Sequence, residues 1–343
     1  MFGIIPVSRR FTTSVGVDMG TGNTLVHVRG EGIVLNEPSV VAVDTVDRTV
    51  KAVGLDAKQM IGRTPGRLEA IRPLRDGAIA DVTLAEEMLR RFLRRAIHRW
   101  HRAAWVHVVV AVPTGLTVLE RRAIEASALA AGARAVHTVP EPIAAAIGIG
   151  LDVDTAEGHV VVDIGGGSTQ IAVMALGGIL SGASVRVGGD RLDRAIAAHI
   201  RRNYGLVIGE ASAEQVKIRL GAAELGPEAR TTTVSGRDLV SGLPKTIVVD
   251  AADVQEAIRE PIQQMVDAVI QALEKAPPEL AGDIVDRGIT LAGGGALLTG
   301  LDRLIARAAG VPVRVAADPM TCVVRGTARI VEDFERYRGL QIA

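Results

Sequence analysis

The segment "VVVDIGGGSTQIAV", residues 160–173, has a near copy earlier in the same chain, "VGVDMGTGNTLVHV", residues 15–28. Each copy predicts a strand rich in β-branched residues, a tight glycine turn and a second strand. An offset of 145 residues superposes the two copies and pairs Asp18 with Asp163, Gly20 with Gly165, Gly22 with Gly167 and Thr24 with Thr169. The repeat therefore predicts two related domains, each with a hairpin whose turn follows an aspartate.

Size and composition agree with two globular domains. The chain has 343 residues, which exceeds the size at which a single hydrophobic core stops growing. Lys plus Arg and Asp plus Glu both total 39, so the net charge is zero and we expect no nucleic-acid partner. The single cysteine, Cys322, excludes an intramolecular disulfide and a multi-cysteine metal site. We expect it to be a small buried side chain in a reducing compartment.

Neither a membrane span nor a signal peptide is predicted. The longest apolar runs, such as 143–151, fall far short of the roughly 20 residues that a spanning helix needs. The first residues, "MFGIIPVSRRF", place their charges after a short apolar run, which reverses the order in a signal peptide. We therefore expect a cytoplasmic protein.

The order of expected elements predicts an α/β fold in each half, with strands around a mixed sheet and helices packed on it. The clearest helix covers 82–101, and a buried strand follows at 105–113. In the second half we expect a helix that stops at Gly205, a short helix opened by Ser212 and a long helix, about 253–275, that Pro261 should kink.

The glycine turns have the chemistry of phosphate-binding loops. Glycines remove Cβ atoms, so backbone N–H groups can converge on an anion. Asp18 and Asp163 would repel phosphate directly, but each could hold Mg²⁺ or its waters against it. One such turn is also explained by an ordinary hairpin, whereas two copies in register favour two domains that grip one polyphosphate. The third glycine run, 293–295, lies between a strand and a helix, which suits close approach to a nucleotide.

Longer matches connect these turns to a known family. The segments "EPIAAAIGIGL", "RVGGDRLDRAI" and "RGITLAGGGALLTGLDRLI", with others along nearly the whole chain, resemble the actin-like ATPase superfamily and within it the MreB family of bacterial actins. The resemblance implies two duplicated ribonuclease-H-like domains around a cleft that binds ATP with Mg²⁺. We expect domain I at 1–151 with a small subdomain at about 33–80, and domain II at 152–343 with one at about 190–260, the closing helix returning toward domain I.

The resemblance also implies roles for particular residues. The first phosphate loop would comprise Asp18, Gly20, Thr21, Gly22, Asn23 and Thr24, and the second Asp163, Gly165, Gly166, Gly167 and Ser168. Further contacts would come from Gly188, Gly189 and Asp190 near the phosphates and ribose, Glu214 and Lys217 at ribose and adenine, and Gly293, Gly294 and Gly295 at the adenosine. Glu141 would orient the attacking water as the catalytic residue. From the residues alone, the pair at 214 and 217 also fits a solvated ion pair, and Glu141 a polar helix start.

Two departures from the family pattern concern hydrolysis. Pro140 stands where the family has a glutamate before Glu141, and Gln170 stands where it has a glutamate after the second turn. The remaining groups suffice for nucleotide binding, so a slow ATPase and a non-hydrolysing scaffold stay open as alternatives. An actin-like small-molecule kinase would need an aspartate base and a larger substrate-binding insert, and no such insert is evident.

A basic segment suggests contact with anionic lipid. No acidic residue lies between Met88 and Leu119, while six arginines fall at 90–102 beside Trp100 and Trp105. A solvated helix face explains the same pattern. Some relatives carry a bulky apolar pair where this chain has Ala103 and Ala104, so anchoring would use Trp100, Trp105 or the terminal Phe2, Ile4 and Ile5. The resemblance further implies homopolymer filaments, cell wall synthesis proteins as partners and a location at the inner face of the cell membrane.

Overall fold

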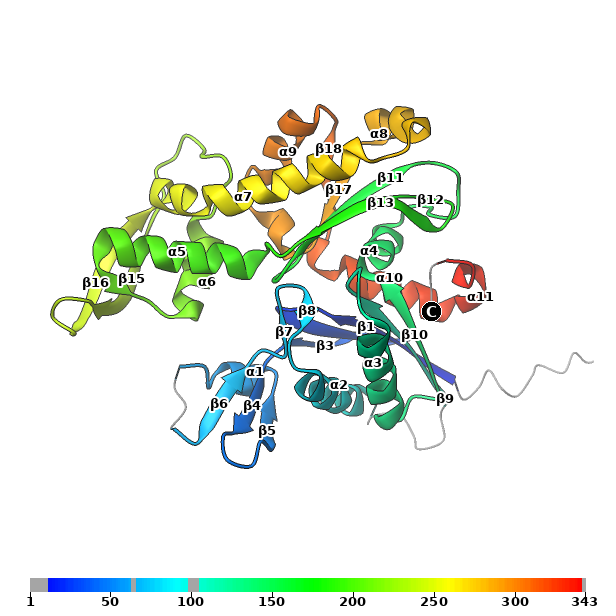
Figure 1. The fold of residues 1–343 in the computed structure, drawn as a ribbon, viewed down its shortest axis with the longest axis horizontal. Coiled ribbons are helices and arrows are strands. Elements are labelled where there is room, and N and C mark those ends of the chain that lie inside the picture. The colour runs from blue at the N-terminus through cyan, green and yellow to red at the C-terminus, as the bar shows by residue number, and fades with distance from the viewer. Residues whose placement is uncertain (1–11, 63–65, 98–104, 341–343) are drawn as a thin grey trace, which may run out of the picture. The chain divides into compact units, whose positions relative to one another are not determined.

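The computed structural model describes residues 12–62, 66–97 and 105–340. The chain separates into two compact units (Figure 1). Unit 1 comprises the residues up to Asp154 together with those from Thr321 onward, and unit 2 comprises Thr155–Met320. Each unit has a hydrophobic core of its own, built on its own five-stranded sheet.

The two sheets have the same strand order. In unit 1, three antiparallel strands continue into two parallel ones: β3 (Gly32–Pro38), β2 (Asn23–Val28), β1 (Thr12–Met19), β9 (Trp105–Val112) and β10 (Ala135–Pro140). In unit 2 the corresponding series is β13 (Gly178–Val185), β12 (Thr169–Ala175), β11 (His159–Ile164), β17 (Ile289–Ala292) and β18 (Val313–Val315). The duplication predicted from two short segments thus extends to the topology of both sheets.

The hairpin register repeats as well, which confirms the two predicted hairpins. Asp18 pairs with Leu25 across β1 and β2, and Asp163 pairs with Gln170 across β11 and β12. Both members of the second pair lie 145 residues beyond the first, the same offset that superposes the sequences. A one-residue slip would move every buried side chain to the opposite face, so the matched register is fixed by the valine-rich cores.

The helices and small strands of unit 1 follow local signals in the sequence. Thr117 and Glu120 form a capping box at the start of α3, with the Glu120 N–H donating to Thr117 Oγ1 over 3.2 Å. The other elements are α1 (Leu55–Lys58), α2 (Val82–Ile97), α3 (Val118–Ala130), α4 (Glu141–Ile149), α10 (Cys322–Glu332), α11 (Phe334–Tyr337), and the strands β4 (Val41–Asp44), β5 (Val50–Val53), β6 (Leu68–Ile71), β7 (Leu74–Arg75) and β8 (Ala78–Ile79). Cys322 is buried, as predicted.

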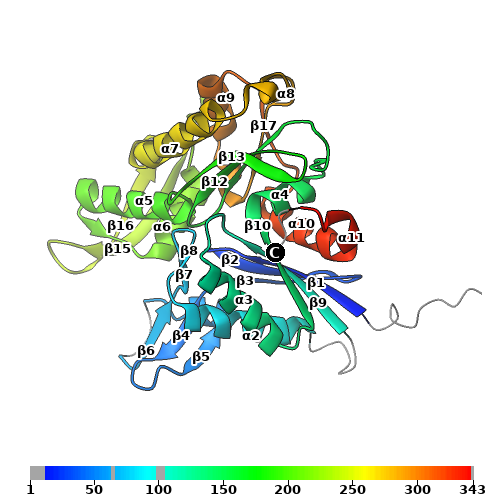
Figure 2. The same ribbon diagram turned by 45° about the vertical axis from the view of Figure 1, so that its right-hand side comes forward.

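Unit 2 adds five helices and a second, three-stranded sheet among its described residues. They are α5 (Gly189–Tyr204), α6 (Glu210–Leu220), α7 (Ala251–Glu274), α8 (Ala281–Arg287), α9 (Leu301–Ala309), β14 (Leu206–Val207), β15 (Thr231–Asp238) and β16 (Pro244–Asp250). α5 and α7 lie side by side in both views (Figures 1 and 2). α7 continues through Pro261 as one helix.

One predicted helix stop is confirmed and one helix start is wrong. α5 ends at Gly205, whose φ of 62° is the left-handed conformation that glycine adopts at little cost. α6 begins at Glu210, two residues before the expected Ser212, because Gly209 has the extended backbone of an N-cap residue. Within the described ranges, no helix combines the length and apolar character needed to cross a membrane.

Helices α4 and α10 of unit 1 cross with their backbones in contact (Figure 1). A Cβ atom added at Gly148 would lie 1.8 Å from the carbonyl oxygen of Cys322, and one added at Gly326 would lie 1.7 Å from that of Ala144. Each helix contributes small residues four positions apart to this contact. The crossing therefore tolerates no side chain at either glycine, and it fixes α4, which begins at Glu141.

We expect Gly148→Ala and Gly326→Ala each to destabilise the protein by about 3 kcal/mol or more, because overpacking against a backbone carbonyl forces the two helices apart. Thermal unfolding followed by circular dichroism measures the effect. Gly282→Ala is the matched control, since Gly282 lies in α8 with open space around it and alanine favours helix. Equal melting temperatures for Gly148→Ala and Gly282→Ala would show that the crossing is not tightly packed.

Candidate functional site

A residue outside the hairpin, Ser39, forms hydrogen bonds with the first glycine turn. Ser39 Oγ donates a hydrogen bond to the carbonyl oxygen of Gly20 over 2.6 Å and lies 2.9 Å from Thr24 Oγ1. The Ser39 N–H also donates to the Gly22 carbonyl over 3.0 Å. Ser39 and Thr24 are both fully buried, so these bonds form away from water. Sequence reasoning missed Ser39, although a polar residue directly before the buried run "VVAV" could have drawn notice.

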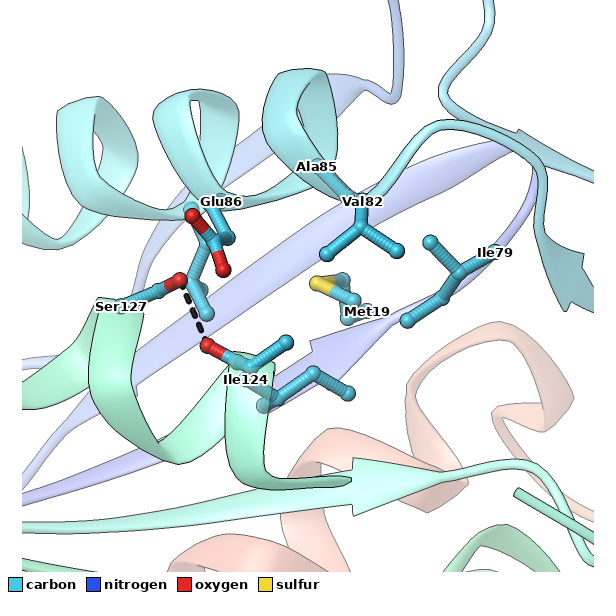
Figure 3. A pocket seen from close by; sticks show the side chains of 9 residues that line it. Met19, Ile79, Val82, Ala85, Glu86, Ile124 and Ser127 are labelled. Atoms are coloured by element: carbon cyan, nitrogen blue, oxygen red, sulfur yellow. Dashed lines mark hydrogen bonds between the residues drawn. The ribbon is translucent and has the colours of Figure 1, made fainter. Parts of the chain in front are cut away.

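Apolar packing fixes the strand that leads into this turn. Met19 follows Asp18 and lies between Val82 of α2 and Ile124 of α3, with Ile79 beside it (Figure 3). The cavity left among these side chains measures only about 10 Å³, roughly the room that one water molecule needs. The end of β1 therefore has little freedom to shift, and the position of the turn is set by the core of unit 1.

Glu141 lies at the same sheet edge as the first turn. Asp18 of β1 and Val139 of β10 both align with Ala111 of β9, and all three strands are parallel. Their carboxyl ends therefore share an edge, with β1 and β10 about 10 Å apart across the intervening strand. Glu141 follows β10 directly as the first residue of α4, and only 8% of it is exposed.

In unit 2 the second glycine turn packs against the start of α5. The Gly165 N–H donates to the Ser168 carbonyl over 2.9 Å and closes the turn. The N–H groups of Gly189 and Asp190 donate to the carbonyls of Gly165 and Gly166 over 3.0 and 2.8 Å. A Cβ atom at Gly188 would lie 2.6 Å from both of these carbonyl oxygens, so backbone packs directly on backbone.

The third glycine run, residues 293–295, packs against the second glycine turn. β17 is parallel to β11 and aligns Ala292 with Asp163, so Gly293 follows beside Ile164. Gly293 has φ 78°, and a Cβ there would lie 2.4 Å from the Ile164 carbonyl oxygen; a Cβ at Gly295 would lie 2.2 Å from the Ile164 side chain. A short 3-10 turn, Gly294–Leu297, begins within this glycine run, and α9 follows it. The structure thus brings three predicted segments of unit 2 together at one sheet edge.

Lys217 is tied to this edge by a partner that sequence reasoning missed. Its ammonium donates to the carbonyl oxygen of Gly189 over 3.1 Å and to Asp193 Oδ2 over 2.9 Å. Glu214 lies one turn earlier on α6 and is half-buried. The signal that could have found Asp193 is its place in "GGDRLD", where it follows Asp190 by three residues and so shares its helix face.

Burial controls the charge of Asp163. Only 7% of the residue is exposed, and desolvation raises the pKa of its carboxyl to about 6. No other residue in the described part of the chain offsets that desolvation. A carboxylate at a strand end beside glycine backbone is a fitting ligand, directly or through water, for Mg²⁺ bound to a phosphate.

The comparisons with known proteins agree with this geometry. The family model for MreB/Mbl protein matches residues 12–339. The chain belongs to the MreB/Mbl family. Its relatives include the cell shape-determining proteins MreB of Escherichia coli (strain K12), 50% identical over 96% of each chain, and Mbl of Bacillus subtilis (strain 168), 46% identical over 95% of this chain and 98% of that one.

Solved structures of similar proteins confirm the actin-like fold. MreB5 of Spiroplasma citri bound to ADP superposes with a TM-score of 0.89 at 35% identity, over 95% of this chain and 98% of that one. The same protein bound to AMPPNP gives a TM-score of 0.87. The MamK double helical filament, at 21% identity and a TM-score of 0.78, is similar in fold alone.

The two residues that depart from the MreB pattern, Pro140 and Gln170, each suit their position in the fold. Pro140 caps α4 with φ −58° and ψ 133°, a conformation that suits proline before a helix. Gln170 is buried and pairs directly across the hairpin with Asp163, so a glutamate there would place a second carboxylate against the first. The neutral amide avoids that repulsion.

We expect the Mg²⁺-dependent part of nucleotide affinity to fall below pH 6. The pKa of about 6 for Asp163 means that its neutral acid predominates at lower pH, and a cation binds only the carboxylate. The fall should approach tenfold per pH unit well below 6 and vanish above pH 7. Calorimetric titration with ADP, with Mg²⁺ and with chelator, measures the difference at each pH.

Asp163→Asn is the control for this titration, because its side chain has nearly the same size but no titrating proton. It should lose the Mg²⁺-dependent part of the affinity at every pH. The same pH dependence in Asp163→Asn, or an equal dependence in chelator, would contradict the assignment of Asp163.

Proposed function

We propose that this protein is a cytoskeletal, actin-like protein of cell shape that binds ATP with Mg²⁺ and assembles into filaments. The observation that carries the proposal is that two glycine segments, 188–189 and 293–295, pack on the turn at Ile164–Gly166, where a Cβ atom at Gly188, Gly293 or Gly295 would lie only 2.2 to 2.6 Å from its atoms. Support comes from the relatives, since the Escherichia coli protein is named cell shape-determining and the Spiroplasma protein is bound to ADP and AMPPNP.

Each part of the site would contribute one kind of contact. The backbone N–H groups of the two turns would bind the phosphates, and the glycines at 293–295 would let the adenosine approach. Asp18 and Asp163 would hold Mg²⁺ through its waters, and the ion would neutralise phosphate charge. Thr21, Asn23 and Ser168 would add side-chain hydrogen bonds. Because the two turns are duplicates, we expect both to bind the same nucleotide.

We propose that Glu141 acts on a water rather than on the nucleotide. It is the first residue of α4, and only 8% of it is exposed. An ionised carboxylate accepts hydrogen bonds, which is what orienting an attacking water requires. With Pro140 before it, the adjacent position offers no second carboxylate. We therefore assign slow ATP hydrolysis to Glu141.

Glu141→Gln is expected to bind ATP like the parent and to assemble in its presence, while phosphate release falls about 100-fold or more, because a water-positioning group acts mainly in the transition state. Phosphate release and light scattering with ATP and Mg²⁺ give both readouts in one experiment. Equal release by variant and parent would make Glu141 structural. A parent that assembles but releases no phosphate would favour the non-hydrolysing scaffold, which the substitutions at 140 and 170 suggest.

We propose that the protein lies at the cytoplasmic face of the cell membrane. The ion pairs of the basic segment limit which of its arginines are available to lipid. Arg90 and Arg91 form ion pairs with Glu87. Arg95 pairs with Glu37, their charged atoms 2.7 Å apart. Two carboxylates, those of Glu87 and Glu37, therefore offset part of the charge of these three arginines within unit 1. Residues 98–104, which include Trp100, lie outside the described residues. The terminal Phe2, Ile4 and Ile5 also lie outside them.

An exposed tryptophan and two arginines without an ion pair to any described residue remain on unit 1. Trp105 is 58% exposed, and the Arg134 guanidinium lies 5.3 Å from its ring centroid. Arg94 is exposed and forms no ion pair with any described residue. Indole and arginine together suit the headgroup region of an anionic bilayer. Attraction should be weaker than the count of arginines in the sequence suggests.

Trp105→Ala combined with Arg94→Ala should reduce pelleting with anionic vesicles, and added salt should weaken the parent's binding, because each arginine contributes about 1 kcal/mol near such a surface. Neutral vesicles should bind little of either protein. Arg201→Ala, an exposed arginine of unit 2, is the matched control. Pelleting that ignores both salt and the double substitution would rule this surface out.

A further inference from the structure

Asp193 is a buried carboxylate beside the proposed nucleotide site. It lies in the second turn of α5, and only 5% of it is exposed. Its Oδ2 accepts the hydrogen bond from the Lys217 ammonium, while its Oδ1 is buried without a hydrogen-bond partner among the described residues. A buried unpaired acceptor atom is costly, so a purely structural reason for Asp193 would have to outweigh that cost.

The ion pair with Lys217 does not offset the cost of desolvating the Asp193 carboxylate. Desolvation raises the pKa of Asp193 to about 6 even though Lys217 acts to lower it. The other charged groups that act on it are Glu214 of α6 and Asp190 of its own helix, and both oppose its ionisation. Apolar side chains of similar volume often stabilise a fold as well as a buried ion pair does, so stability alone gives a weak account of the pair.

The Lys217 ammonium contacts the segment that shapes the second turn. Besides Asp193 it binds the carbonyl oxygen of Gly189, and a Cβ at Gly189 would lie 3.1 Å from Nζ. The Gly189 N–H in turn donates to the Gly165 carbonyl. An unbroken series of contacts therefore runs from Asp193 through Lys217 and Gly189 to the turn at Gly165. An ammonium has three N–H donors, and two of them are used here.

We infer that Asp193 is a positioning residue for the nucleotide: it holds the Lys217 ammonium against the start of α5, with its third N–H available to an acceptor of the bound nucleotide. The ligand class is a nucleoside di- or triphosphate, and the inference rests on the proposed function. Without the carboxylate, the flexible lysine side chain would have to be ordered at the moment of binding, which costs affinity. In this inference Asp193 acts through Lys217 and need not touch the ligand.

The test is a double-mutant cycle on nucleotide affinity with Asp193→Asn and Lys217→Met, using Mg²⁺-ADP as the probe. Asp193→Asn should weaken binding about tenfold in the parent and have no effect in the Lys217→Met background, since its influence passes through the ammonium. Melting temperatures recorded alongside separate loss of fold from loss of affinity. Asp238→Asn is the matched control, because Asp238 forms a similar ion pair with Lys245, 3.0 Å apart, in the β15–β16 hairpin.

Each outcome decides the inference. A tenfold loss that disappears in the Lys217→Met background supports positioning, as does an Asp238→Asn protein with the parent's affinity. An equal loss in both backgrounds, or no loss in either, overturns it, whatever happens to the melting temperature. If Asp193→Asn does not fold, the double variant is compared with Lys217→Met alone, and equal affinities support the inference while a further tenfold loss overturns it. A parent that binds no nucleotide refutes the proposed function itself.

Discussion

Close backbone packing around Ile164–Gly166 is the constraint on which unit 2 depends. The start of α5 and the end of β17 both reach this segment, and their glycines lie where a Cβ atom would be only 2.2 to 2.6 Å from its atoms. Such contacts require glycine at 188, 293 and 295. A Cβ atom at Gly189 would come closest to Lys217 Nζ, at 3.1 Å, and one at Gly294 would have open space.

The duplicated half meets the same requirement by different means. In unit 1 the turn is held by Ser39, whose hydroxyl contacts Gly20 and Thr24 and whose N–H donates to Gly22. In unit 2 it is held by backbone hydrogen bonds to α5, and the Thr169 hydroxyl donates to the Val187 carbonyl just before that helix. The carboxylates differ accordingly, since Asp163 is buried and Asp18 is partly exposed. The two halves thus share strand order and register but have diverged in how they support the turn.

Much of the fold was predictable because its signals are local. The repeat fixes the hairpins, and β-branched runs and glycine stops place most strands and helices. Sequence reasoning missed Ser39 and Asp193, because their partners lie 15 to 24 residues away and the local pattern around each residue names no partner. Distance along the chain also hid an ion pair of α2. Helical periodicity predicts the arginine face of α2, but Glu37, which pairs with Arg95, lies 58 residues away. The start of α6 was misplaced because glycine caps a helix without a side-chain signal.

The two duplicated turns are proposed to bind one ligand. Calorimetric titration of the parent protein with Mg²⁺-AMPPNP measures the number of nucleotides bound per chain. We expect one nucleotide per chain, and a marked loss of its affinity when either Asp18 or Asp163 is replaced by alanine. Two nucleotides per chain, or a single one whose affinity depends on only one of the two aspartates, would contradict it.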